Sequence, residues 1–262
     1  IKKFYSRKDV QKELARIAKD REIAVQFGES GFGKRPDILQ FEADVNELSK
    51  QGVTSFHMSV ERWVDPLQLA SGMTRQKLDE LRKGFDLILD VDSKFIDYSK
   101  IAANIIIEAL KFNGIKNISA KFSGGSGFHI AVPFESFPKN VNNQETRFQF
   151  PEAPKAIANY TKSLIKPHLT EQILSISTLN DISKSINKPK KEILEKGIFN
   201  PFKVIDIDPQ LISSRHMIRM PYSINEKSGL VSIPIAINKV KQFKLNQAKK
   251  QVLIFSGNLS LV

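Results

Sequence analysis

The chain has 262 residues, 41% of them hydrophobic, which is enough for one large domain or two small ones with a sizeable core. Its net charge of +12 predicts a polyanionic partner such as nucleic acid, although an AT-rich, lysine-heavy genome would produce the same excess. The absence of cysteine excludes disulfides and thiolate zinc sites, and no apolar run approaches the ~20 residues of a membrane helix. We therefore expect a cytoplasmic protein with no membrane partner.

Residues 1–84 predict an N-terminal α/β module. Helices and strands are expected to alternate over residues 10–18, 21–27, 41–48, 53–60 and 74–83. A glycine-rich turn after the first strand carries Lys34 and Arg35, which are either simply solvated or in contact with a nucleic-acid backbone. His57 lies on the second strand, and we assign it no metal because a lone histidine on a strand usually finds a local partner.

The stretch from Phe85 to Phe134 organises the rest of the chain. An apolar strand ends in Asp90 and Asp92, whose side chains point to the same face because they are two residues apart. Hard divalent cations prefer such carboxylate oxygens. A helix over residues 97–112 follows the strand. A solvated strand end would explain this pair of carboxylates equally well.

A glycine-rich turn between two short strands completes this stretch. Gly124, Gly125 and Gly127 would let backbone amides turn toward an anion, and His129 follows on the outgoing strand. A tight hairpin needs glycine anyway, so the turn by itself is weak evidence. Its appearance with the two carboxylates, across a strand–helix–strand unit, indicates nucleotide chemistry.

Residues 139–200 predict a helical insertion. Its basic face favours a role in solubility and consists of Lys184, Lys188, Lys190 and Lys191. The sheet pattern then resumes, with strands expected over residues 203–208, 217–220 and 230–235. The first of these strands again places two carboxylates two residues apart, Asp206 and Asp208.

Asp90, Asp92 and Asp206 would form a site for one or two Mg²⁺ or Mn²⁺ ions. Two such ions can activate an attacking hydroxyl and stabilise a leaving pyrophosphate. A basic strand and turn follow the third carboxylate, and Arg219 and Lys227 would neutralise a triphosphate there together with His129. Alternatively, Arg219 forms an ordinary salt bridge and His129 caps the glycine loop.

Three motifs in this order resemble the archaeo-eukaryotic primase superfamily, the small-subunit primases and primase-polymerases. They are Leu89 to Asp92, Ser123 to His129, and Ile205-Asp206 followed by His216 to Pro221 and Lys227 to Gly229. The resemblance covers residues 85–135 and 203–236 well and is fainter over residues 21–66. The helical insertion has no counterpart that we can place.

The resemblance implies roles for individual positions. Asp90, Asp92 and Asp206 match the metal-binding and catalytic aspartates of the family. The implied nucleotide-binding set is Ser123, Gly124, Gly125, Ser126, His129, Arg219, Asn225 and Lys227. Two Mg²⁺ or Mn²⁺ ions are the implied cofactors, with no zinc in this fragment.

The implied fold class is α/β (α+β), a mixed sheet similar to an RNA-recognition-motif core with the N-terminal α/β module and the insertion added. The whole of residues 1–262 would form one primase-polymerase catalytic core, its catalytic sheet built from residues 85–135 and 203–238. The implied reaction is template-directed attack of a 3′-hydroxyl on a nucleoside triphosphate. Single-stranded or primed DNA and nucleoside triphosphates are the implied partners, with further domains or subunits outside a sequence that begins at Ile1.

The departures from the family pattern keep alternatives open. Gly125 and Ser126 stand where many relatives have arginines, Asn225 stands where replicative primases often have histidine, and Asp208 competes with Asp206 as the third ligand. The missing zinc-binding cysteines favour a stand-alone primase-polymerase, including those of plasmids, phages and CRISPR loci. A gap-filling or end-joining repair polymerase, an inactive nucleic-acid-binding module and a nuclease are the alternatives.

Overall fold

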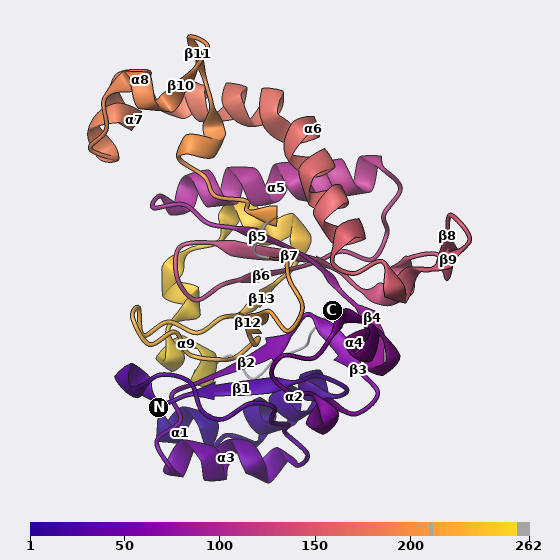
Figure 1. Ribbon diagram of the computed structural model, residues 1–262. Coiled ribbons are helices and arrows are strands. Elements are labelled where there is room, and N and C mark those ends of the chain that lie inside the picture. Colours follow the sequence, from indigo (N-terminus) through magenta and orange to yellow (C-terminus); the bar gives the residue numbers. More distant parts are fainter. Residues whose placement is uncertain (210–211, 256–262) are drawn as a thin grey trace.

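Two antiparallel sheets form the centre of the computed structural model, which describes residues 1–209 and 212–255 (Figure 1). The first has the order β1-β2-β12, made of Ile23–Gln26, Ser55–Ser59 and Met217–Arg219. The second has the order β13-β6-β7-β5, made of Pro234–Ile235, Ser119–Phe122, Phe128–Val132 and Leu87–Val91. The predicted α/β (α+β) class is confirmed, and the described strand pairs are antiparallel.

Helices cover the outer faces of both sheets (Figure 1). The first sheet lies on α1 (Lys2–Tyr5), α2 (Lys8–Ala18) and α3 (Glu42–Lys50), and the second lies under α5 (Ile96–Phe112) and α6 (Glu152–Ile176). The remaining helices are α4 (Arg75–Leu81), α7 (Leu179–Ser185), α8 (Lys190–Ile193) and α9 (Lys250–Phe255). Within the described ranges, no helix is long and apolar enough to cross a membrane.

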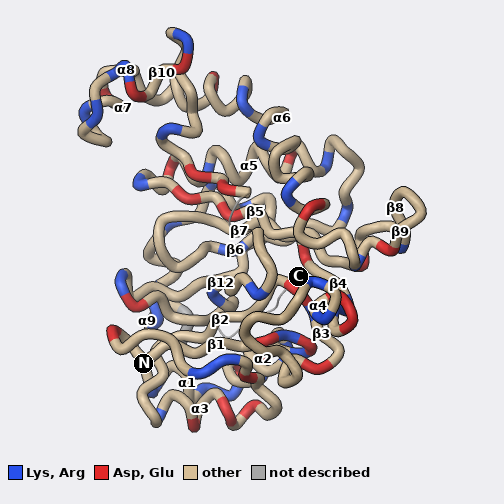
Figure 2. The backbone as a smooth tube through the Cα atoms, in the orientation of Figure 1, with Lys and Arg blue, Asp and Glu red and all other residues tan. Residues whose placement is uncertain are grey.

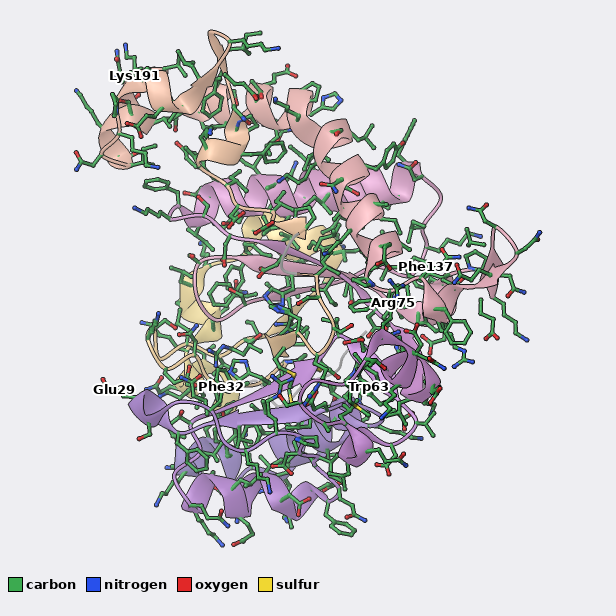
Figure 3. All side chains as sticks on the ribbon, in the orientation of Figure 1. Glu29, Phe32, Trp63, Arg75, Phe137 and Lys191 are labelled. Carbon is green, nitrogen blue, oxygen red and sulfur yellow. The ribbon has the colours of Figure 1, made fainter. Side chains whose placement is uncertain are left out.

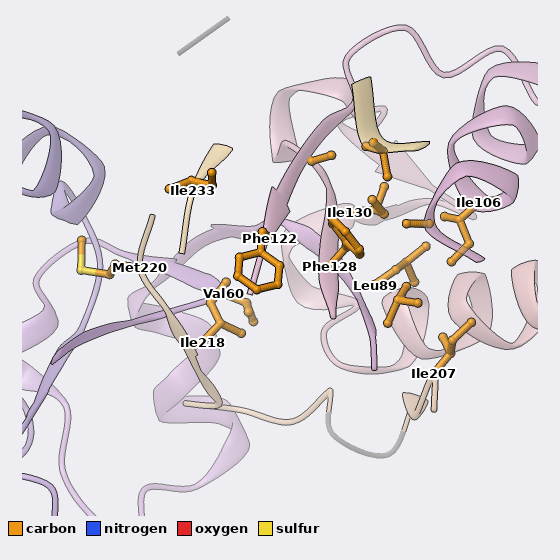
Figure 4. Close-up of a cluster of buried hydrophobic side chains, with 14 of the residues drawn as sticks. Val60, Leu89, Ile106, Phe122, Phe128, Ile130, Ile207, Ile218, Met220 and Ile233 are labelled. Atoms are coloured by element: carbon orange, nitrogen blue, oxygen red, sulfur yellow. The ribbon is translucent and has the colours of Figure 1, made fainter. Parts of the chain in front are cut away.

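The four-stranded sheet is organised by a strand–helix–strand crossover. The chain runs from β5 through α5 to β6, and β7 lies between these two strands, antiparallel to both. Leu89 and Ile130 pair on one face of the sheet and pack into the core with Ile106 of α5 (Figure 4). Because side chains alternate across a strand, the intervening residues Asp90 and His129 point to the opposite face.

The three-stranded sheet also has one apolar face and one polar face. Phe56 of β2 is buried, and its ring meets the ring of Tyr5 at a centroid distance of 5.0 Å. His57 lies on the opposite face and pairs across the sheet with Arg219 of β12. The polar faces of the two sheets are therefore turned toward each other, since the charges of Arg219 and Lys121 both act on His57.

Two predicted strands are shorter than expected. Residues 203–208 contribute one bridge, between Asp206 and Asp92, because Asn200 caps a 3₁₀ turn at Pro201–Lys203 and Pro209 cannot donate a ladder hydrogen bond. Only Pro234–Ile235 of the strand expected over residues 230–235 pairs in the sheet, together with a separate Ile224–Val231 bridge.

The region predicted as a helical insertion holds α6, α7 and α8 together with two short hairpins. These are β8–β9 (Asn140–Val141 and Gln144–Glu145) and β10–β11 (Leu194–Glu195 and Ile198–Phe199). A separate antiparallel pair, β3–β4 (Glu61–Trp63 and Arg82–Phe85), lies along the chain between β2 of the first sheet and β5 of the second, with α4 between its two strands. The division of the chain at residues 84, 139 and 200 stays a prediction.

Candidate active site

A row of ionisable side chains crosses the polar face of the four-stranded sheet. The strand register places Asp90 of β5 opposite His129 of β7, and His129 opposite Lys121 of β6. His129 Nε2 lies 3.3 Å from Asp90 Oδ1, and Lys121 Nζ donates a hydrogen bond to Ser232 Oγ at 3.0 Å. Among the described residues, the buried Oδ1 of Asp90 has no hydrogen-bond partner.

The burial of this row changes the charge that its members carry. Burial, with Asp92 as the next cause, raises the pKa of Asp90 to about 7. Burial also lowers the pKa of Lys121 to about 7 and the pKa of His129 well below its usual value. His129 is therefore a neutral imidazole at neutral pH, which can donate a hydrogen bond to a phosphate but adds no positive charge.

The second and third predicted carboxylates meet at the free edge of β5. The amide of Asp92 donates to the carbonyl of Asp206 at 3.0 Å, and the amide of Asp206 donates to the carbonyl of Asp92 at 2.7 Å. Partial burial and the charge of Asp206 raise the pKa of Asp92. The fold thus brings Asp206 next to Asp92, with Asp208 two residues further along the chain.

The donor set suits a hard divalent cation. Carboxylate oxygens are its preferred ligands, and a cation would satisfy the buried, unpartnered Oδ1 of Asp90. In the described part of the chain, however, no three histidine or acidic side chains already stand in an arrangement that could hold a metal ion. Asp90, Asp92 and Asp206 lie on adjoining segments, so a cation would need oxygens from a ligand or water as well.

The glycine loop packs directly against this edge. Ser123 Oγ accepts hydrogen bonds from the amides of Gly125 and Gly127, both at 3.3 Å, so each of these amides has a partner within the loop. A Cβ atom on Gly127 would lie 2.1 Å from Asp92 Oδ1, which explains the glycine at this position. Gly124 adopts a φ of +94°, a conformation that favours glycine.

The basic strand and turn lie at the other end of the loop. A Cβ atom on Gly124 would lie 3.5 Å from Arg219 Cδ and 3.1 Å from Asn225 Cβ. Arg219 donates to Glu226 Oε2 at 2.9 Å, so it forms an ordinary salt bridge. Asn225 Oδ1 accepts from the amide of Lys227 at 3.0 Å and shapes the turn, which leaves the Lys227 side chain exposed.

Sequence reasoning set His57 aside, and the structure places it in the site. Its Nε2 lies 3.1 Å from Ser55 Oγ, and the ring of the exposed Phe32 meets its ring edge-on at a centroid distance of 5.0 Å. Phe32 is labelled in Figure 3. Burial, followed by the positive charge of Arg219, lowers the pKa of His57 to about 3. Only the pairing of β2 with β12, which are far apart in sequence, reveals this neighbourhood.

Sequence reasoning also missed Lys121 and Glu226. Lys121 has a local signal that could have revealed it, since it is a lysine inside an apolar strand two residues before Ser123. Of the two predicted nucleic-acid contacts, Lys34 is exposed, whereas Arg35 donates to the buried carboxylate of Glu22 at 3.0 and 3.1 Å. Arg35 therefore has a structural partner already.

Comparisons with known proteins place the chain in a family. The sequence profile of the DNA primase small subunit matches residues 78–237. The chain is 25% identical over 209 residues to the DNA primase small subunit PriS of Pyrobaculum calidifontis, covering 70% of this chain and 63% of that protein. It is 24% identical over 212 residues to PriS of Archaeoglobus fulgidus, covering 68% and 61%. The chain thus spans about three fifths of the length of these relatives.

A solved structure shares the fold. It is the polymerase domain of Mycobacterium tuberculosis Ligase D in complex with DNA, with a TM-score of 0.59 and 15% identity, covering 99% of this chain and 89% of that chain. Since the family profile spans more than half of the sequence and includes both carboxylate segments and the glycine loop, this chain belongs to the DNA primase small subunit family.

Proposed function

We propose that this chain is a template-directed nucleotidyltransferase that synthesises or extends DNA or RNA primers from nucleoside triphosphates. The observation that carries the proposal is the edge of β5, where Asp90, Asp92 and the backbone-paired Asp206 lie beside a glycine loop. Single-stranded or primed DNA is the proposed template.

Asp90, Asp92 and Asp206 are the groups that would hold two Mg²⁺ or Mn²⁺ ions. When bound, the ions supply activation of the attacking hydroxyl and stabilisation of the leaving pyrophosphate. The three carboxylates would keep the ions at the edge of β5, beside the glycine loop.

The glycine loop and the basic turn would hold the triphosphate of the incoming nucleotide. His129 donates a hydrogen bond as a neutral imidazole, while Arg219 and Lys227 supply the positive charge. Since Arg219 is paired with Glu226, a phosphate would share or replace that carboxylate as the partner of the guanidinium. The amides of Gly125 and Gly127, which donate to Ser123 Oγ, would exchange this acceptor for phosphate oxygens.

The test uses Mn²⁺, a single-stranded template and labelled nucleotides, with and without an annealed primer. Asp90→Asn and Asp92→Asn should each lower incorporation by on the order of 10³-fold, because each removes a cation ligand from the reaction centre. Asp97→Asn is the matched control, since it removes an exposed carboxylate on α5 that pairs with Lys100 at 2.9 Å. The control should retain full activity.

Each outcome of this test decides between functions. Products with and without primer, lost in both aspartate variants, support a primase-polymerase. Products only with primer support a polymerase that extends. No product together with tight binding of DNA would support an inactive nucleic-acid-binding module instead, and an active Asp90→Asn variant would overturn the assignment of the cation site.

A further inference from the structure

A β-hairpin, β10–β11, stands at the outer end of the helical insertion (Figure 1). Its two strands are joined by Lys196 and Gly197, whose φ values of +52° and +81° are both positive, as the type I′ turn of a two-residue hairpin requires. Glu195 Oε2 accepts hydrogen bonds from Lys166 Nζ of α6 at 2.9 Å and from Asn200 Nδ2 at 3.2 Å. The hairpin is therefore fixed on α6.

This hairpin turns one apolar side chain away from the molecule. Because side chains alternate along a strand, Phe199 points into the core and is 3% exposed, whereas Ile198 points outward and is 70% exposed. A single exposed isoleucine is ordinary on a protein surface. Its meaning depends on the charges that surround it.

Lysines dominate the surface around the hairpin. Residues 179–203 hold six lysines and three acidic residues, and all six lysines are exposed. Two of the carboxylates have other partners, since Asp181 caps α7 and Glu195 pairs with Lys166. In the described ranges none of the six lysines forms an ion pair, so this end of the molecule carries uncompensated positive charge (Figure 2).

The surface fits a nucleic-acid duplex better than a single strand or a protein. Single strands are held by stacking of bases on exposed aromatic rings, but Phe199 and Phe202, the aromatic residues of this segment, are buried and half-buried. A protein partner would need an apolar patch rather than one side chain. Ammonium groups match the closely spaced phosphates of a duplex, and an isolated apolar side chain beside them fits a groove.

The chain keeps this surface close to the carboxylate edge of β5. Ile198 and Asp206 are eight positions apart, and a chain spans at most about 3.6 Å per residue, so their Cα atoms lie no more than about 29 Å apart. Asp206 is bonded through its backbone to Asp92. Successive base pairs are about 3.4 Å apart, so this limit corresponds to about eight base pairs of a duplex that begins at the carboxylates.

We infer that the outer end of the insertion binds the primer–template duplex that the reaction produces. Lys190, Lys191 and Lys196 contact its phosphates, and Ile198 lies against its groove. Lys191 lies at this end of the molecule (Figure 3). The inference rests on the proposed function and gives the basic face of the insertion a role beyond solubility. Loss of this contact should shorten the products, because the duplex dissociates sooner, without slowing the formation of each bond.

The lysine contacts are tested by a triple variant, K190A, K191A and K196A. Its matched control removes the same charge from exposed positions on and beside α2, with K8A, K12A and K19A. Fluorescence anisotropy measures the affinity for a duplex of about 20 base pairs, roughly two helical turns, and for a single strand of the same length. The triple variant should bind the duplex about tenfold or more weakly, with a salt slope smaller by about 3, and the control should not.

The apolar contact is tested by Ile198→Ser. Its matched control is Val64→Ser, which alters a side chain of similar size and exposure, 63%, next to β3. Ile198→Ser should weaken duplex binding by about tenfold, because apolar surface is no longer buried, and should leave the salt slope unchanged, because no counterion is involved. An affinity equal to that of the Val64→Ser variant would remove Ile198 from the contact and overturn its part of the inference.

Two outcomes overturn the inference as a whole. One is equal duplex affinity of the triple variant and its control, and the other is an equal loss on duplex and single strand, which would show attraction to any polyanion. The binding assay needs no turnover. Products of normal length from the triple variant would therefore count against the duplex surface and leave the proposed function standing, whereas duplex binding through the hairpin in a chain that makes no product would contradict the proposed function alone.

Discussion

Burial sets the properties of the individual residues at the site. Asp90, His129 and Lys121 are neighbours in one row, and burial shifts the pKa of each toward its uncharged form. A cation or a phosphate would reverse this shift by supplying the charge that the row lacks.

Gly127 is the residue at which the site tolerates least change. Gly127→Ala would place a methyl group 2.1 Å from Asp92 Oδ1 and 2.2 Å from the carbonyl oxygen of Val91. We expect it to lower stability by about 1–3 kcal/mol through overpacking and to lower nucleotide incorporation by displacing Asp92. Urea denaturation and the primer-extension assay measure the two effects.

Gly125→Ala is the control, because its methyl group would lie at ordinary distances, 3.6 Å from Asn225 Nδ2 and 3.7 Å from Ser123 Oγ. Its stability should change by no more than about 0.5 kcal/mol. If both variants were equally stable, the close packing of the glycine loop against the carboxylate edge would be incorrect.

Buried ion pairs join the elements that carry the site. Glu22, which precedes β1, accepts hydrogen bonds from Arg35 and from Arg215, which precedes β12. Glu61 of β3 pairs with Arg82 of β4 at 2.8 Å, and both side chains are fully buried. These contacts fix the start of β12 and therefore help to position Arg219.

Removing one partner of the buried β3–β4 pair should be costly. Glu61→Ala leaves the buried Arg82 guanidinium with Asp79, a partly exposed carboxylate, as its remaining ion-pair partner. We expect a loss of about 3 kcal/mol in the free energy of unfolding, since removing one partner of a buried pair is strongly destabilising. Glu47→Ala removes an exposed partner of Lys50 and should leave the denaturation midpoint nearly unchanged, because exposed ion pairs contribute little to stability. Similar midpoints for the two variants in urea denaturation would contradict the structural role of the pair.

The ion pairs of Glu22 with Arg215 and Arg35 predict that the protein loses stability in acid. Burial by itself would raise the pKa of Glu22, but hydrogen bonds from Arg215 and Arg35 lower it below its usual value. The unfolded state then binds the proton more readily, so the stabilisation is complete above the unfolded pKa of about 4.3 and is lost as pH falls through the folded pKa. Glu22→Gln should therefore flatten the decline of melting temperature below about pH 4.5, and an unchanged pH profile would count against the pair.

The whole molecule places its site between two sheets and carries a net charge of +12. Figure 2 shows basic residues along α7 and α8, at the far end of the insertion. Such a molecule should hold nucleic acid largely through contacts to phosphates. Binding that displaces counterions weakens as salt concentration rises.

Affinity for single-stranded DNA should therefore fall steeply with salt. Three to five phosphate contacts predict a loss of about 20- to 100-fold between roughly 50 and 200 mM monovalent salt. Fluorescence anisotropy of a labelled oligonucleotide measures this slope, and sucrose at equal osmolality serves as the control. A slope near zero would contradict the phosphate-contact argument.

The sequence by itself was sufficient for features that local spacing controls. The period of 3.6 residues predicted α5, and the period of two put Asp90 and Asp92 on one face of a strand, because both depend on neighbours a few residues away. The glycine loop and the α+β class were also readable, and the order of three motifs indicated the family that the profile confirms. The catalytic roles of these residues stay a prediction.

The tertiary structure decided what depends on contacts between distant segments. It paired Asp206 with Asp92, 114 positions apart, shortened the strand expected over residues 203–208, and placed His57 next to Arg219. No local pattern encodes these results, since they arise when separate elements bury their apolar faces together and bring their polar faces into contact.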